Sequence, residues 1–349
     1  MRNWRTPFAE QAEWCARMDA PFMALLCEAL PDALEGEEDF SRRIREWPIR
    51  AGAANADALV LRVTGALNAA RRAGKLRQLG SFYPPAALPA RSDLVRVLRA
   101  AIAEGDACLT PWLGSAPQTN EVGRSGALMP GLMVIAARTG LPLRLFEIGA
   151  SAGLNLRLDD YGYDLGGQRA GRIESPVQLK PLWQGAPPPA QKVHIRERRG
   201  VDLNPLDVTD ADTRARLLAY VWPDQQARVE RLEAALDLAA FDPPPLDRGD
   251  GAEWVERHLR LNEGAATVLM HSVALQYFPR TSQNRIVAQM RRIGQVASQA
   301  APLAWLSYEM VEVGKPMQLR LTLWPDGTEM LLAHVHPHGS EITWLADTD

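Results

Sequence analysis

The chain has 349 residues, of which 46% are hydrophobic and 23% are charged, and its formal net charge is -3. This composition is typical of a folded globular protein and excludes a disordered chain, while the near-neutral charge offers no excess of Lys and Arg to capture a nucleic-acid backbone. The three cysteines lack C-x-x-C spacing, which excludes a disulfide framework and a zinc knuckle, and no apolar run is long enough to span a bilayer. We therefore expect a cytoplasmic protein with no nucleic-acid or membrane partner and leave its oligomeric state open.

Residues 1 to about 115 show apolar positions at helical spacing and no convincing strand. We expect four or five helices in this segment, which would form a helical cap before a second domain at 116–349. Proline interrupts helical hydrogen bonding, so the expected helix breaks are Pro31, Pro48, Pro84, Pro85 and Pro111.

A polar segment at 117–125 precedes a strongly apolar helix at 127–137. It contains Asn120, Glu121 and Arg124, which would form a lid or substrate-binding loop, with the Arg124 guanidinium donating to a carboxylate. The alternative is a helix cap, in which Thr119 or Asn120 accepts the first helical amides and Glu121 lies near the positive helix end.

The stretch from Leu145 to Leu156 runs from apolar residues through Glu147 to a turn of small residues and then an amphipathic run. This pattern predicts a buried strand, a tight loop and a helix that begins near Leu154. Gly149 and Gly153 would let the backbone turn sharply and let a ligand approach it closely. The amides at the start of the helix would face anything negatively polarised above the loop.

Beyond this corner, the Gly166-Gly167 pair between strand-type residues predicts a β-hairpin insertion at about 161–190. A second core strand at 192–205 would contain Asp202 near its end. A helical pattern interrupted at Pro223 covers 210–240, and a short strand near 246–248 would precede Asp250 and the helix that follows.

The run from Ala266 is continuously apolar, as in a strand that is covered on both faces of a parallel sheet. A helix at 282–297 and a fifth strand at 303–308 follow. Alternating residues on either side of Pro325-Asp326-Gly327-Thr328 then predict a terminal hairpin. The expected fold class is therefore α/β, with strand–helix alternation that ends in an antiparallel hairpin.

These features resemble two known families. Residues 140–345, with Glu147-Ile148-Gly149-Ala150-Ser151-Ala152-Gly153 as the glycine-rich motif, resemble the Rossmann-like class I S-adenosylmethionine-dependent methyltransferases. The whole chain, through 118–124 followed by 147–156, resembles DUF2332, a bacterial family of unknown function.

The methyltransferase resemblance implies that S-adenosylmethionine is the cofactor. The glycine-rich loop would pass beneath its methionine part, Glu147 would support the loop or the amino group, Asp202 would bind the ribose and Asp250 the adenine amino group. The residues expected at the cofactor are Glu147, Gly149, Ala150, Ser151, Gly153, Asn155, Asp202, Asn204, Asp250, Gly251, Met270 and Ser272.

Three departures from the family pattern stand out. Ser151 replaces the central glycine of the usual motif, and Asp202 lies much farther from the loop than an acid in this role does, so Glu174 is the alternative ribose-binding residue. The N-P-P-Y signature of enzymes that methylate nucleic-acid amino groups is missing after the fourth strand, which argues against DNA bases as substrate.

Methyl transfer to an alcohol or amine needs an aligned acceptor and a group that removes its proton. His271 is the candidate base, and the alternative is a structural histidine that donates to a neighbouring group. Tyr277 is a second candidate catalytic residue, and Gln276 would orient the acceptor. His334, His336 and His338 alternate, but Pro337 interrupts the strand pattern, and we expect no metal site.

The sequence thus predicts an S-adenosylmethionine-dependent methyltransferase that acts on a small hydroxyl- or amine-bearing molecule, with the helical segment selecting that molecule. One alternative is a non-catalytic sensor or assembly protein that retains the cofactor site. A second is an NAD-dependent oxidoreductase, because strand, glycine-rich loop, helix and acid recur in that class as well.

Overall fold

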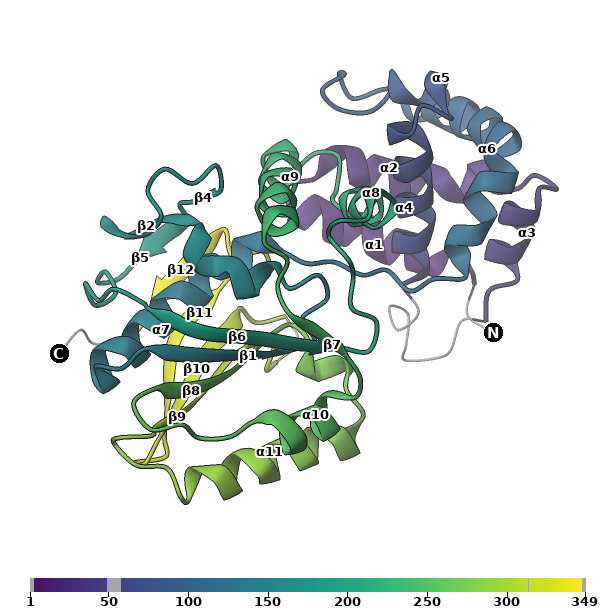
Figure 1. Cartoon of the computed structure of the whole chain (residues 1–349). Helices are drawn as coiled ribbons and strands as arrows, with labels where there is room; N and C mark the ends of the chain where they lie inside the picture. Colours follow the sequence, from purple (N-terminus) through teal and green to yellow (C-terminus); the bar gives the residue numbers. More distant parts are fainter. Residues whose placement is uncertain (1–2, 49–57, 313, 347–349) are drawn as a thin grey trace. The chain divides into compact units, whose positions relative to one another are not determined.

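The computed structural model describes residues 3–48, 58–312 and 314–346 (Figure 1). The chain forms two compact units. Unit 1 comprises Met1–Thr119 together with Ala211–Glu230, and unit 2 comprises Asn120–Asp210 together with Arg231–Asp349. Segment 211–230, which we expected within the second domain, thus belongs to the helical unit.

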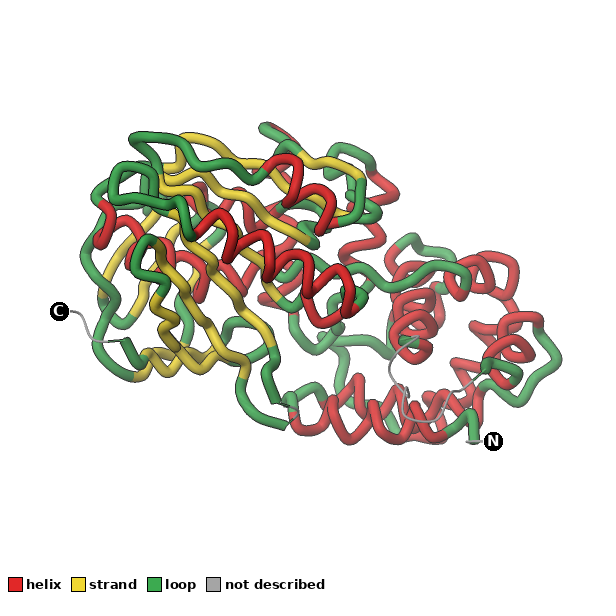
Figure 2. The backbone as a smooth tube through the Cα atoms, turned by 90° about the horizontal axis from the view of Figure 1, so that it is seen from below, coloured by secondary structure: helices red, strands yellow, loops and turns green. Residues whose placement is uncertain are grey.

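Unit 1 is helical throughout the part that the structure describes, as its sequence pattern predicts (Figure 2). Its apolar positions form one core that joins the N-terminal helices to Trp222 of the later segment. The helices are α1 (Thr6–Arg17), α2 (Pro21–Ala33), α3 (Asp39–Arg45), α4 (Leu59–Arg72), α5 (Arg77–Gly80), α6 (Arg91–Leu113) and α8 (Ala211–Ala219); α9 (Gln226–Phe241) begins in this unit and continues into unit 2.

Two of the expected helix breaks are wrong. Pro31 lies inside α2 and Pro111 inside α6, each two residues before the helix ends. A proline in the last turn removes one hydrogen bond from a part of the helix that is about to end, so the cost stays local. Burial of the apolar face of each helix outweighs that cost.

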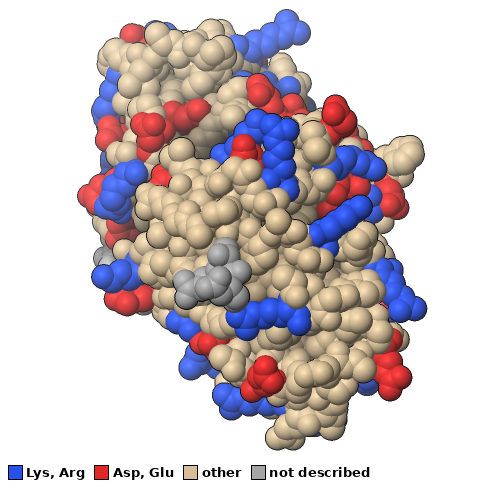
Figure 3. Space-filling view, turned by 90° about the vertical axis from the view of Figure 1, so that its left-hand side faces the viewer, with Lys and Arg blue, Asp and Glu red and all other residues tan. Residues whose placement is uncertain are grey.

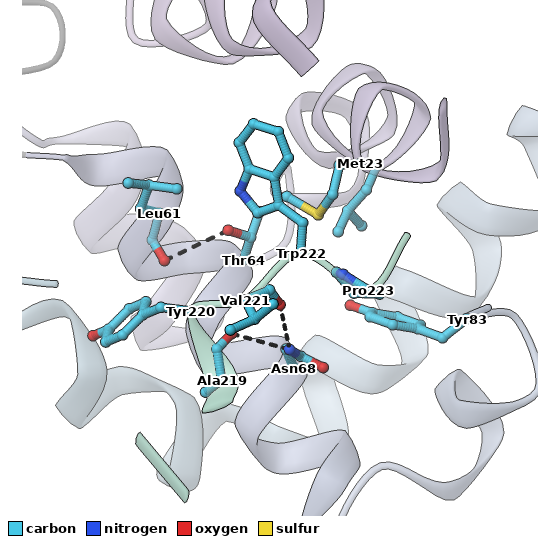
Figure 4. Close-up of a pocket in the computed structure, with 11 residues that line it drawn as sticks. Met23, Leu61, Thr64, Asn68, Tyr83, Ala219, Tyr220, Val221, Trp222 and Pro223 are labelled. Carbon is cyan, nitrogen blue, oxygen red and sulfur yellow. Dashed lines mark hydrogen bonds between the residues drawn. The ribbon is translucent and has the colours of Figure 1, made fainter. Parts of the chain in front are cut away.

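Segment 211–230 is tied to unit 1 by hydrogen bonds to its helices. The carboxylate of Asp224 accepts from the amides of Phe22 (2.7 Å) and Met23 (3.0 Å), which caps the start of α2. The side-chain amide of Asn68 on α4 donates to the carbonyls of Ala219 (3.0 Å) and Val221 (3.3 Å) (Figure 4). The pocket beside these bonds has a cavity volume of about 10 Å³, which is room for about one water molecule.

Unit 2 is a mixed α/β unit built on a nine-stranded sheet in the order β5-β12-β11-β10-β9-β8-β1-β6-β7. Strands β7, β6, β1, β8 and β9 are parallel to one another, and β9 to β12 continue as an antiparallel meander. The strands are β1 (Leu143–Ile148), β5 (Leu182–Gln184), β6 (Ile195–Asp202), β7 (Leu246–Arg248), β8 (Ala266–Ser272), β9 (Leu303–Glu309), β10 (Met317–Trp324), β11 (Thr328–Val335) and β12 (Glu341–Trp344).

Helices cover both faces of this sheet, which explains the apolar strand sequences. All seven residues of β8 are buried, as expected of a parallel strand between two helical layers. Helix α7 (Ser125–Thr139) packs on one face, where Gly131 lets the helix approach Leu306 of β9. On the other face, α10 (Gly251–His258) and α11 (Arg280–Gly294) share a core with Phe146 and Ile148 of β1.

A β-hairpin lies in the region where an insertion after β1 was expected, although β5, also within 161–190, belongs to the main sheet. Strands β2 (Gly162–Leu165) and β3 (Gln168–Gly171) form a hairpin, and β4 (Gln178–Leu179) pairs with β2 to make a separate three-stranded sheet. Gly166 and Gly167 both have positive φ at the hairpin turn, as a two-residue loop of this kind requires.

The α-helix expected from Leu154 is not formed, and Leu154–Asp160 is instead the 3-10 helix η2. Two of its carbonyl groups accept hydrogen bonds from side chains outside the helix. The Tyr161 hydroxyl donates to Leu154 O (2.7 Å), and Arg198 donates to Leu156 O (2.7 Å). These bonds replace the i to i+4 bonds that an α-helix would make.

Among the described residues, no helix combines the length and the apolar character needed to cross a membrane. On the face seen in Figure 3, acidic and basic side chains are interspersed and neither sign forms a single continuous patch.

Candidate functional site

The candidate site lies at the edge of the sheet where β7, β6, β1 and β8 end. Among the parallel strands, β1 is first in the chain and stands between the second, β6, and the fourth, β8. The chain therefore runs from β1 to β6 on one side and later from β7 back to β8 on the other side of β1, and such a switch point is where open α/β sheets bind ligands. The glycine-rich loop, Asp202, Asp250 and Ser272 follow or end these four strands, so the fold brings them to one edge.

The loop after β1 is held in a sharply turned conformation. Gly149 and Gly153 have φ of 67° and 72°, and Ser151 has a φ of 54°, in the left-handed region that favours glycine. A Cβ at Gly149 would lie 2.5 Å from the Cβ of Ala274, and one at Gly153 would lie 2.6 Å from Cγ of Pro244. Packing within the protein thus requires these glycines, and their positive φ agrees with the sharp turn expected of them, while the close approach of a ligand stays a prediction.

Two backbone hydrogen bonds hold Ser151 in its strained conformation. Its amide donates to Asp202 Oδ2 (2.9 Å), and its carbonyl accepts from the amide of Leu206 (3.0 Å). Asp202 Oδ1 accepts from the amide of Asn204 (2.8 Å). Asp202 thus fixes the loop through one carboxylate oxygen and the start of its own connection through the other.

Asp202 and not Glu174 ends the strand beside β1. Glu174 is exposed in the connection between β3 and β4. The next residue after the acid, Leu203, is 72% exposed, which leaves an apolar side chain at the carboxyl edge. Leu203 is not among the residues predicted for the site, and its only signal in the sequence is that it is an apolar residue directly after the acid.

Asp250 caps α10 at the end of β7. Its Oδ1 accepts from the amides of Ala252 and Glu253, both at 3.0 Å, and its Oδ2 accepts from the Ser282 hydroxyl (3.3 Å). The neighbouring Gly249 is in open surroundings, since a Cβ there would meet no atom within 4 Å. Gly251, by contrast, is packed against the ring of Phe278.

Glu147 is a buried carboxyl group at the end of β1, with 2% of its surface exposed. Burial raises its pKa well above the usual value, and the negative charge of Asp202 raises it further, while Arg124 and a hydrogen bond with Asn155 act in the opposite direction. The Ser125 hydroxyl donates to Asn155 Oδ1 (2.8 Å) and so fixes that amide. Glu147 Oε2 has no hydrogen-bond partner among the described residues.

The polar segment before α7 clamps the glycine-rich loop. Asn120 Oδ1 accepts from the amide of Leu154 (2.9 Å), and Glu121 Oε1 accepts from the amide of Gly123 (2.9 Å) at the 3-10 helix η1 (Val122–Arg124). Both side chains are buried, as a clamp requires and an exposed lid does not. Both residues therefore act as caps, as in the alternative expected from the sequence. Asn120 caps η2 and Glu121 caps η1, however, and neither caps the apolar helix α7.

Arg124 reaches from η1 to the strand ends. Its Nη1 donates to the carbonyl of Ser272 (3.1 Å), the last residue of β8, and its Nε donates to the carbonyl of Pro337 (3.3 Å). Arg124 as a whole is half-buried. Arg124 therefore lies at the switch point. Its expected role there, donating to a carboxylate of a ligand, stays a prediction.

His271 has partners for both ring nitrogens and is 1% exposed. The indole of Trp305 can only donate, so its bond to Nε2 (2.9 Å) makes Nε2 an acceptor and assigns the proton to Nδ1, which donates to Glu309 Oε1 (2.6 Å). Burial acts to raise the pKa of Glu309, but the bonds from His271 and two backbone amides outweigh burial and lower it. With no lone pair open to a substrate, His271 matches the structural alternative and not the expected base.

The loop after β8 holds the other predicted substrate residues. Tyr277, at 76% exposure, and Gln276 both face solvent in η3 (Leu275–Tyr277), whereas Met270 is fully buried in the sheet. Val273 has a φ of 51°, which is a strained conformation for a β-branched residue and has no signal in the sequence.

Among the described residues, no group of three or more His, Cys, Asp or Glu side chains is arranged to hold a metal ion. The rings of His336 and His338 lie edge to face, 5.4 Å apart, and the His338 amide donates to His336 Nδ1 (3.2 Å). These contacts belong to a turn beyond β11.

Comparison with known proteins identifies the family. A model of the family described as "Uncharacterized protein conserved in bacteria (DUF2332)" matches residues 5–344, so the chain belongs to this family. No curated protein matches the chain, and no solved structure does.

Proposed function

We propose that this member of the DUF2332 family binds S-adenosylmethionine at the carboxyl edge of its sheet and transfers the methyl group to a small hydroxyl- or amine-bearing acceptor. The observation that carries the proposal is the 2.9 Å hydrogen bond from the Ser151 amide to Asp202 Oδ2. It joins the glycine-rich loop after the first parallel strand to the acid after the second. The strand order third-second-first-fourth-fifth is the one expected of a Rossmann-like sheet that binds a nucleotide at its switch point.

The residues at this edge fit the chemistry of such a cofactor. Two buried polar atoms in or next to the loop, Ser151 Oγ and Glu147 Oε2, have no hydrogen-bond partner among the described residues. Buried polar atoms are normally paired, so both are suited to a polar ligand. Beside Asp202, the open surroundings of Gly249 and the exposed Leu203 leave room and an apolar contact for a flat ring.

Each residue then has a definite task. Asp202 accepts hydrogen bonds from the two ribose hydroxyls, because a carboxylate only accepts hydrogen bonds and so suits a diol. Leu203 packs against the adenine face. Bound S-adenosylmethionine supplies a methyl group on a sulfonium, which is already reactive, so the main task of the protein is to hold the acceptor in line. Because both nitrogens of His271 are engaged, this residue does not remove the acceptor proton.

Calorimetric titration of the full chain with S-adenosylmethionine, S-adenosylhomocysteine and NAD tests the proposal. We expect micromolar binding of the first two, and weakening of at least about 10-fold in Asp202→Ala, because hydrogen bonds to a charged group contribute about 1.5–3 kcal/mol. Asp207→Ala is the matched control, since Asp207 is an exposed acid in the same connection that bonds to the Thr209 amide (2.8 Å). Absence of binding of both sulfur compounds to the wild-type chain refutes the proposal, and binding of NAD alone favours an oxidoreductase.

A non-catalytic binder is the second candidate function. The observation in its favour is His271, whose ring has no nitrogen left for proton transfer. Incubation with methyl-labelled S-adenosylmethionine and a pool of small metabolites separates the two. Labelled product supports the transferase, whereas tight binding without any labelled product supports a sensor or assembly role.

A further inference from the structure

Glu309, the last residue of β9, carries a largely buried carboxylate at the edge of the sheet where the candidate site lies. Its oxygen Oε1 accepts from His271 Nδ1 (2.6 Å) and from the amides of Ala274 (3.0 Å) and Leu275 (3.1 Å). The other oxygen, Oε2, is buried and has no hydrogen-bond partner among the described residues. Buried polar atoms are normally paired, which makes Oε2 an exception within the fold.

No cation balances the charge of Glu309 within the part of the chain that the structure describes. Among these residues, the side chain in ion-pair range is His271, and the Trp305 indole that donates to His271 Nε2 (2.9 Å) leaves this ring neutral. Burial acts to raise the pKa of Glu309, but hydrogen bonds from His271 and two backbone amides lower it overall, so the carboxylate is ionised at neutral pH. An unbalanced buried charge is unfavourable, and a cationic ligand nearby would stabilise it.

Ala274 links Glu309 to the glycine-rich loop. Its amide donates to Glu309 Oε1, and its side chain packs on the loop, since a Cβ at Gly149 would lie 2.5 Å from the Cβ of Ala274. Strand β9 stands two strands from β1, which is about 10 Å at the usual spacing of strands. Opposite charges at this separation still attract each other where the protein excludes water. A cation held above the loop would therefore be attracted by Glu309 without touching it.

The connection after β8 is fixed around this carboxylate. Val273 is strained, with a φ of 51°, and its amide donates to the carbonyl of Tyr308 (2.8 Å). The next two amides along the chain are those that Glu309 accepts. Backbone strain persists where the surroundings enforce it and is common at ligand sites. The negative charge is therefore held in place before a ligand arrives, and binding requires little reorganisation.

We propose that Glu309 recognises the positive charge of the sulfonium, so that the site selects S-adenosylmethionine over the neutral S-adenosylhomocysteine. The inference rests on the proposed function, because that cofactor would place a cation above the glycine-rich loop. Both compounds share the nucleoside and the amino acid group, and they differ in the charge on sulfur. When the methyl group leaves, sulfur keeps the electron pair of the broken bond and becomes neutral. The attraction then ends, which favours exchange of the spent product for fresh cofactor.

Calorimetric titration of the full chain with three ligands tests the inference. Two are S-adenosylmethionine and S-adenosylhomocysteine, and the third is sinefungin, which carries an ammonium group on carbon in place of the methylated sulfur. Unit charges about 10 Å apart, at an effective dielectric constant of about 20, correspond to roughly 15-fold in affinity. We expect the wild-type chain to bind both cationic ligands about 10- to 30-fold more tightly than S-adenosylhomocysteine. Equal or tighter binding of S-adenosylhomocysteine overturns the inference.

Glu309→Gln removes the charge and keeps an oxygen that can accept from the two amides. It should reduce the preference for both cationic ligands to within about twofold and leave the affinity for S-adenosylhomocysteine unchanged. Glu197→Gln is the matched control, because Glu197 is an acid near the start of β6 that bonds to Arg144 (2.6 Å) at the opposite edge of the sheet. This control should retain the full preference. Unchanged binding of S-adenosylhomocysteine shows that a variant is folded, and the wild-type comparison needs no variant.

The outcomes also separate this inference from the proposed function. If the wild-type chain binds none of the three ligands, the proposed function fails and the inference falls with it. If the ligands bind but Glu309→Gln keeps the preference for the cations, or weakens all three equally, Glu309 only anchors the connection after β8. The inference is then overturned while the proposed function stands.

Discussion

Replacing Ser151 with glycine should stabilise unit 2, because this serine is strained and its hydroxyl is unpaired. Its φ of 54° lies in the left-handed region, which costs an L-residue about 1–2 kcal/mol. Glycine relieves that strain but adds about 0.5–1 kcal/mol of backbone entropy to the unfolded chain, so the net gain from conformation is about 1 kcal/mol. Ser151 Oγ is buried without a partner, and its removal adds about 1 kcal/mol more.

Ser151→Ala is the matched control, because it removes the hydroxyl but keeps the Cβ that causes the strain. We expect alanine to raise the free energy of unfolding by about 1 kcal/mol and glycine by about 2 kcal/mol. Scanning calorimetry resolves the transition of unit 2, which should shift upward by about 2–4 °C per kcal/mol for a unit of this size. Equal shifts for the two variants, or a downward shift for glycine, would refute the argument that the loop is strained at Ser151.

Three further variants test other parts of the structure. Glu147→Gln should stabilise the chain more at pH 8 than at pH 5, because the raised pKa of Glu147 makes its contribution to stability fall as pH rises through the folded-state value; a pH-independent difference in urea unfolding contradicts this. His271→Ala should lower the free energy of unfolding by about 1.5–3 kcal/mol, because it removes one hydrogen bond to the buried Glu309 carboxylate and leaves only the two backbone amides on it, and a loss below about 1 kcal/mol in denaturant titration speaks against that role. Asn68→Ala should cost unit 1 about 1–3 kcal/mol through two unpaired carbonyls, seen as a downward shift of its calorimetric transition with that of unit 2 unmoved.

Local patterns in the sequence determined most of the secondary structure. The continuous apolar run from Ala266 to Ser272 is the fully buried strand β8, and Gly166-Gly167 is the turn of the inserted hairpin. Such patterns are reliable because burial on two faces, or a positive φ at a turn, restricts which residues a position accepts. The order of strands and helices along the chain was sufficient for an α/β fold class.

Contacts between distant segments decided what local patterns could not. Arg198, 42 residues later in the chain, donates to a carbonyl of the run after Leu154, which forms a 3-10 helix, and hydrogen bonds of Asp224 and Asn68 join segment 211–230 to the helical unit. For the candidate site, the sequence determined which residue types follow each strand. Only the tertiary structure shows that Trp305 and Glu309 form hydrogen bonds with both ring nitrogens of His271. These partners lie 34 and 38 residues away in the sequence, so no local pattern reveals them.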